Sequence, residues 1–115
     1  MVQNRNKLIE LFISNISNSI THEILEKATF QNELIIKYDK ELLNSLVIAK
    51  KYREKINPKE TSFPFKDISY IREKIMSKVK AELLLRISKG YTNIDLNLIE
   101  QLTDRYLKET NIIKK

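Results

Sequence analysis

The segment 67–90, DISYIREKIMSKVKAELLLRISKG, has the clearest structural signal in this chain. Apolar residues recur in it at every fourth position, which places them on one side of an α-helix; they are Ile71, Ile75, Val79 and Leu83. Asp67 is a suitable N-cap, and Gly90 stands where a left-handed residue would end the helix. The pattern predicts a helix over 67–89 that forms the long central rod of a bundle, about 33 Å in length at roughly 1.5 Å per residue.

Two helices are expected before this segment. Isoleucines spaced by three and four predict a helix over 7–27. A break is expected near 19–21, because the Ser and Asn residues of 14–19 compete for backbone hydrogen bonds and Thr21 could cap a new helix start. A second helix is predicted to begin at Asp39, or as early as Phe30. It ends at Asn57-Pro58, because proline disfavours helical geometry in the residue before it.

One more helix is expected after Gly90. Thr92 and Asp95 have the spacing of a capping box, so a helix of about 15 residues is predicted to follow them. The remaining residues, 111–115, form a short tail. The predicted fold class is an all-α bundle of four to five helices with short connections, and the 115 residues are enough for a single domain, 1–115.

The connector over 57–66 contains two aromatic residues, Phe63 and Phe65, on either side of a proline. Such a pair either pins a loop to the core or docks on a partner, and pinning is the commoner outcome because monomers seldom expose large apolar patches. Leu84 and Leu85 lie outside the main stripe of the 67–89 helix. All four residues are therefore candidates for a protein interface.

Composition excludes most catalytic and metal sites. The sequence has no Cys and one His, which excludes disulfides, thiolate nucleophiles, Cys-type zinc sites and paired-His metal sites. Gly90 is the only glycine, so no glycine-rich phosphate loop can form. His22 has neither a nucleophile nor an orienting acid at a recognisable spacing. We expect a protein that is not an enzyme and has no cofactor, metal or small-molecule substrate.

The expected location is cytoplasmic. The N-terminal residues form no apolar signal segment, because Glu10 interrupts the run over 8–13. Uninterrupted apolar stretches such as 83–85 are far below the roughly 20 residues that a membrane-spanning helix needs. No contact with a membrane is therefore expected.

The net charge of +6 comes from the middle of the chain. Residues 50–90 contain twelve basic and five acidic side chains, whereas the segments on either side are close to neutral. Concentrated positive charge favours an anionic partner. The candidates for contact with a nucleic acid or an acidic protein are Lys50, Lys51, Arg53, Lys55, Lys74, Lys78 and Lys89. The alternative is that these side chains only solvate a helix surface, which is common for exposed charge.

The stretch 72–90, together with 93–106, resembles a known family. Its long basic and apolar helix, glycine-ended turn and following helix are similar to the α-helical domain of archaeal GINS subunits, mainly over residues 67–107. The resemblance implies a helical subunit of a tetrameric scaffold that joins the replicative helicase to its partners. Such analogy concerns the fold first and the function only indirectly.

Two functions remain as hypotheses. The first is a non-enzymatic helical interaction subunit in a homo- or hetero-oligomer, with the DNA replication complex as the assembly that the resemblance implies. The second is a small basic protein that binds DNA or RNA directly, or regulates such binding. Tyr52 and Tyr70 lie in the basic segment and suit base stacking, although rings at a bundle edge more often cover the core.

Overall fold

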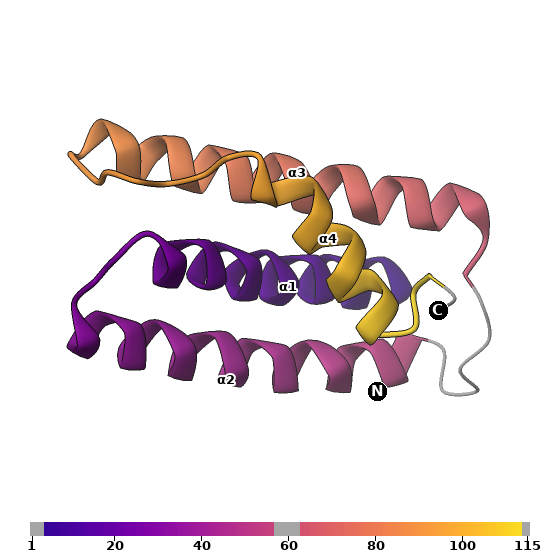
Figure 1. Cartoon of the computed structure of the whole chain (residues 1–115). Coiled ribbons are helices and arrows are strands. Elements are labelled where there is room, and N and C mark those ends of the chain that lie inside the picture. Colours follow the sequence, from indigo (N-terminus) through magenta and orange to yellow (C-terminus); the bar gives the residue numbers. More distant parts are fainter. Residues whose placement is uncertain (1–3, 57–62, 114–115) are drawn as a thin grey trace.

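The computed structural model describes residues 4–56 and 63–113, and its four regular elements are all helices. They are α1 (Arg5–Lys27), α2 (Asn32–Ile56), α3 (Phe65–Ser88) and α4 (Leu98–Glu109). The predicted all-α bundle is confirmed. α1 and α2 form an antiparallel hairpin, α3 runs beside α1, and α4 crosses the bundle obliquely (Figure 1).

The centre of the bundle is α1, so the expected central position of the 67–89 helix is not confirmed. α1 packs against each of the other three helices, whereas the backbones of α2 and α3 do not come close to each other in the described residues. Twelve residues of α1 are buried. α3 buries four, which are the predicted stripe of Ile71, Ile75, Val79 and Leu83. Periodicity correctly identifies the buried side of α3 but not the helix that all the others contact.

α1 is continuous, and the predicted break near 19–21 does not occur. Two of the polar side chains in its middle, those of Asn18 and Ser19, bond to α2 instead of competing for their own backbone. The Ser19 hydroxyl donates to the carbonyl oxygen of Leu42 at 2.9 Å, and the Asn18 amide donates to the Ser45 hydroxyl. Because a neighbouring helix satisfies these groups, they do not interrupt the helix.

α3 begins two residues earlier than expected. Pro64 is its N-cap, and Asp67 lies in the first turn, where it accepts a hydrogen bond from Arg5 at 2.7 Å. Proline suits a helix start because its φ is fixed and it needs no N–H partner there. The prediction that Asp67 is the N-cap of this helix is therefore wrong.

The predicted end of α3 at Gly90 is confirmed. Gly90 has a φ of 101°, the Gly90 N–H donates to Ile87, and the Tyr91 N–H donates to Arg86. These two bonds form a Schellman motif, which satisfies the last carbonyl groups of a helix. The residue at this position must adopt positive φ, which glycine does at no steric cost.

α4 starts at Leu98, so the predicted capping box at Thr92 does not form. Asn93 has a φ of 64°, in the left-handed region, which is incompatible with a helix through this residue. The Asp95 carboxylate accepts a hydrogen bond from the Asn97 N–H at 2.9 Å and shapes the turn before α4. Within residues 4–56 and 63–113, no helix is long and apolar enough to cross a membrane.

Candidate functional site

Arg53 is a structural residue and not a surface contact. The prediction that it contacts a nucleic acid or an acidic protein is therefore wrong. Its side chain is buried, with 3% of the residue exposed. Nε donates to the carbonyl oxygen of Thr110 and Nη2 to that of Asn111, both at 3.1 Å. The guanidinium carbon also lies 4.5 Å from the centre of the Phe63 ring. Arg53 thus ties the end of α2 to the chain that follows α4.

Phe63 is likewise buried, so it is not available as an interface residue. Its ring is covered by Arg53 and lies 5.9 Å from the guanidinium carbon of Arg5. The alternative that the connector is pinned to the core therefore holds for Phe63. Phe65, two residues later, is 83% exposed and remains a candidate contact. The rest of the predicted connector before Phe63, residues 57–62, lies outside the described residues.

The other predicted cations of α2 are accessible, but they do not all lie on one side of the helix. Lys50, Lys51 and Lys55 are exposed and all lie within two turns of the helix. Lys51 and Lys55 are four residues apart and share one side of α2, whereas Lys50 is rotated away from them by at least about 100°. Lys55 also contacts the Tyr52 ring, with Nζ 5.7 Å from its centre.

The predicted cations on α3 and at its C-cap share one side of the helix. Lys74, Lys78 and Lys89 are exposed, and their spacing of four and eleven residues keeps them on that side. Lys74 lies over the Tyr70 ring, with Nζ 5.8 Å from its centre. Lys78 borders a groove between α3 and α1.

Leu84 and Leu85, the two predicted interface residues of α3, are partly accessible. They are 46% and 49% exposed. Because adjacent residues of a helix are rotated by about 100°, the two side chains cannot lie on one side. They therefore expose apolar area in two different directions and not along one line.

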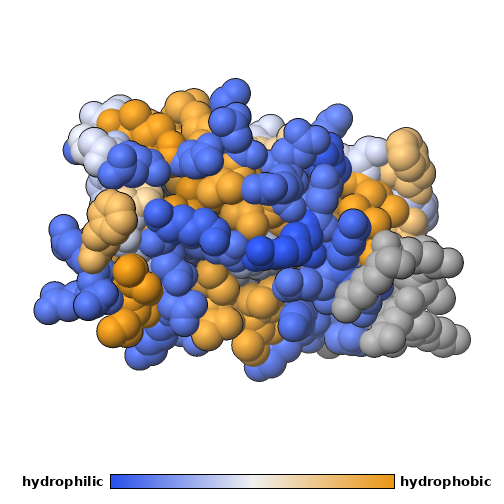
Figure 2. All heavy atoms as spheres, in the orientation of Figure 1, coloured by the Kyte–Doolittle hydropathy of each residue, from blue (hydrophilic) through white to orange (hydrophobic). Residues whose placement is uncertain are grey.

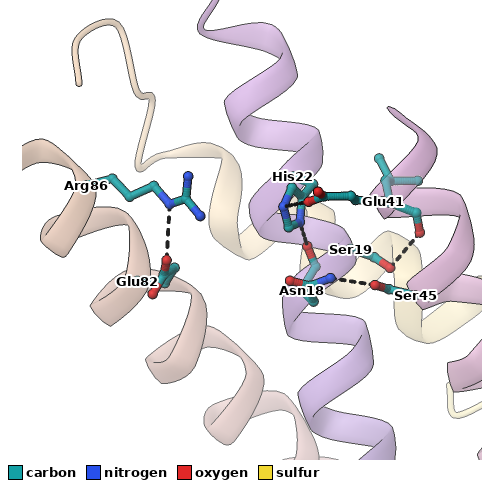
Figure 3. A network of polar contacts seen from close by, with 8 residues as sticks. Asn18, Ser19, His22, Glu41, Ser45, Glu82 and Arg86 are labelled. Carbon is teal, nitrogen blue, oxygen red and sulfur yellow. Dashed lines mark hydrogen bonds and ion pairs between the residues drawn. The ribbon is translucent and has the colours of Figure 1, made fainter. Parts of the chain in front are cut away.

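The groove between α1 and α3 is a polar hollow in the described structure. It has a volume of about 490 Å³, and side chains of α1 and α3 line it: Ser14, Asn15, Ser17, Asn18, Thr21, Lys78, Glu82 and Arg86. α1 therefore contributes hydroxyl and amide groups, and α3 contributes charged groups. Figure 3 shows Arg86 and Glu82 on α3 opposite the polar residues of α1.

A network of polar contacts between α1 and α2 lies beside this groove (Figure 3). His22 is buried, its Nδ1 hydrogen-bonds the carbonyl oxygen of Asn18 at 2.7 Å, and its Nε2 contacts the Glu41 carboxylate. The ring also packs against Tyr38, with centroids 5.7 Å apart. Both ring nitrogens are engaged, so neither is open to a substrate. This geometry suits a structural role for His22.

The Ser17 hydroxyl is the exception in this polar region. Ser17 is 6% exposed, and its Oγ has no hydrogen-bond partner among the described residues. Such an unpaired buried hydroxyl is uncommon in native structures. Composition alone suggests only that these serines weaken the helix. The sequence signal for a shared role is their spacing, since Ser14, Ser17 and Thr21 fall on one side of a helix.

Charged residues elsewhere hold the helices together. Arg72 on α3 donates to both oxygens of Asp104 on α4, at 2.8 and 3.2 Å, and to Glu100 at 3.1 Å. Its hydrogen bond to Asp104 raises the pKa of Arg72. Burial, together with a hydrogen bond to Glu23 at 2.7 Å, raises the pKa of Tyr106 above the ordinary tyrosine value. No group of three or more His, Cys, Asp or Glu in the described part of the chain could hold a metal ion.

An unexpected apolar strip lies on the outer side of α2. Ile36 is 68% exposed, Leu43 is 51% exposed, and Val47 is 54% exposed. Their spacing of seven and four residues places them in one line along the helix. Figure 2 shows apolar side chains at the surface along the α2 edge, interrupted by hydrophilic ones. We call these three residues the outer strip of α2.

The local sequence does not indicate that Leu43 and Val47 lie on the outer side of α2. The signal that could have identified them is the number of apolar residues in α2, which exceeds what one buried stripe accommodates. The local pattern does not show which of these residues a neighbouring helix covers.

Comparison with known proteins identified no relative of this chain. The chain matches no protein-family model, and comparisons with curated proteins and with solved structures found no similar protein. The resemblance of residues 67–107 to archaeal GINS subunits therefore stays a prediction.

Proposed function

We propose that the protein is a non-enzymatic interaction subunit that binds a partner protein through the outer strip of α2. The observation that carries the proposal is the alignment of Ile36, Leu43 and Val47, each more than half exposed, on one line of a 25-residue helix. Burying a large aliphatic side chain stabilises an assembly by about 1.5–3 kcal/mol when it was fully exposed before. Half of that for each of the three residues is about 2–4 kcal/mol, a substantial contribution toward the cost of association, which the rest of an interface must also offset.

The position of α2 in the bundle supports this proposal. α2 packs on α1 alone among the described helices, so the side that faces away from α1 is open. A helix with apolar residues spaced by four and seven suits the groove or helix face of another protein. Leu84 and Leu85 on α3 offer a second, less regular apolar surface. The resemblance of 67–107 to GINS subunits makes a replication scaffold the first assembly to test.

The test compares two double variants of equal chemistry. Leu43→Gln/Val47→Gln removes apolar surface from α2, and Leu84→Gln/Leu85→Gln removes a similar amount from α3. Light scattering gives the molar mass of each protein alone, and affinity purification from the native host shows which proteins accompany each one. We expect the α2 variant to lose the oligomer or the partner while the α3 variant keeps it. Identical masses and identical accompanying proteins for the wild type and the α2 variant would refute the proposal.

Direct binding of nucleic acid is the second candidate, and the cations of α3 favour it. Lys74, Lys78 and Lys89 are exposed on one side of a long helix, and Tyr70 lies next to Lys74. Long cationic side chains in this arrangement reach phosphates, without a recognition helix aimed into a groove. Such phosphate contacts raise the affinity for DNA or RNA to the same extent whatever the nucleotide sequence.

Salt dependence tests this second candidate. In a Lys74→Gln/Lys78→Gln/Lys89→Gln variant, the slope of log affinity against log salt on duplex DNA should fall by roughly 0.9 for each phosphate that is no longer neutralised. The matched control is Lys50→Gln/Lys51→Gln/Lys55→Gln, which removes the same charge from α2 and should change the slope less. Absence of salt-dependent binding to DNA or RNA at low ionic strength would exclude the candidate.

A further inference from the structure

The groove between α1 and α3 is unusual because polar side chains line the contact between two helices. Helices of a bundle normally meet through apolar residues. Here α1 presents three hydroxyl side chains, Ser14, Ser17 and Thr21, toward the groove. The volume of about 490 Å³ falls within the range of small-molecule sites, roughly 300–1,000 Å³.

Ser17 supplies the observation that points to a ligand. Its Oγ is buried and unpaired, although a serine within a helix can bond the carbonyl group four residues earlier. Its neighbour Ser19, on the α2 side, does have a partner in Leu42. Leaving a buried hydroxyl unpaired destabilises a protein, and a ligand in the groove would provide the missing acceptor.

The charged wall of the groove defines the chemistry of that ligand. Lys78 and Arg86 bring two positive charges, and Glu82 brings one negative charge. Glu82 accepts a hydrogen bond from Nε of Arg86 at 3.1 Å, so its charge is already balanced. Burial alone would lower the pKa of Arg86, but the hydrogen bond and charge of Glu82 outweigh it and the pKa is raised. One positive charge, that of Lys78, remains for a ligand.

We propose that the α1–α3 groove binds a small polar molecule through an oxyanion, held between Lys78 and the hydroxyl groups of Ser14, Ser17 and Thr21. Phosphate fits better than carboxylate, because its tetrahedral oxygens accept from more of these donors at once. The Arg86 guanidinium, oriented by Glu82, lines the same groove (Figure 3). This ligand is distinct from the partner of the outer strip of α2.

The first experiment measures binding of inorganic phosphate and of acetate at constant ionic strength, with chloride as the reference. Backbone NMR shifts locate the site, and calorimetry gives the affinity. Lys78→Gln should weaken phosphate binding roughly tenfold or more, since it removes a charge-assisted contact. The control is Lys80→Gln, which removes the same charge two residues later on a different side of α3 and should change affinity less than about twofold.

The second experiment separates a binding role of Ser17 from a structural one. Ser17→Ala removes an unpaired hydroxyl and introduces a better helix former, so it should keep or raise the melting temperature while weakening phosphate binding several-fold. Ser19→Ala removes a paired hydroxyl, so it should lower the melting temperature and leave phosphate binding unchanged. A role in packing alone would not give these opposite effects.

Three results would overturn the proposal. The first is that neither phosphate nor acetate shifts the resonances of residues in the groove. The second is equal weakening by Lys78→Gln and Lys80→Gln, which indicates attraction to the general charge of α3. The third is binding of DNA without binding of inorganic phosphate, which assigns Lys78 to a nucleic-acid surface. Preference for acetate over phosphate would refute the choice of phosphate and support the oxyanion site.

Discussion

Replacing Arg53 by alanine is expected to lower the melting temperature by roughly 10 to 20 °C. The side chain donates charge-assisted hydrogen bonds to the carbonyl oxygens of Thr110 and Asn111, each worth about 1.5–3 kcal/mol. Its stacking on Phe63 adds about 0.5–2 kcal/mol. One guanidinium makes all these contacts, so they are not additive, and a total destabilisation of about 3–5 kcal/mol is expected. That amount is a large part of the stability of a domain of this size.

Thermal unfolding followed by circular dichroism measures this effect. Lys51→Ala is the matched control, because Lys51 is an exposed cation on the same helix. Its substitution should change stability by less than about 0.5 kcal/mol. Arg53→Lys keeps the charge but not the planar pair of donors, so its melting temperature should lie between those of the wild type and Arg53→Ala. Equal melting temperatures for Arg53→Ala and Lys51→Ala would contradict the structural assignment of Arg53.

Three further predictions concern stability. Val79→Asp should unfold the protein at room temperature, because a fully buried, unpaired carboxylate costs several kcal/mol; a folded variant by circular dichroism would contradict this. Gly90→Ala should cost about 1 kcal/mol in urea unfolding because of the positive φ alone, since nothing lies within 4 Å of the added carbon; an unchanged urea midpoint would argue against this. Burial, Asp39 and Glu23 raise the pKa of Glu26, so its negative charge destabilises the folded state at neutral pH. Glu26→Gln should therefore raise the melting temperature slightly at pH 7, and this gain should vanish once the pH falls below the unfolded glutamate pKa of about 4.3.

The candidate site was only partly predictable from the sequence. Charge counting correctly located exposed cations such as Lys78, but it treated Arg53 as one of them. The type of a residue fixes the charge of its side chain but not whether carbonyl groups from a distant segment surround it. Residues 110 and 111 lie more than fifty positions from Arg53, and only folding brings them together. The unpaired hydroxyl of Ser17 is equally invisible without its neighbours.

Local sequence was sufficient to establish the helical class, the buried stripe of α3 and its end at Gly90. These features depend on local physics, namely the 3.6-residue period and the backbone freedom of glycine. Contacts between helices were needed to establish that α1 is the central helix and that its serines and asparagines do not break it. The same contacts leave Ile36, Leu43 and Val47 of α2 in solvent. Periodicity shows which side of a helix is apolar, but packing chooses which helix covers that side.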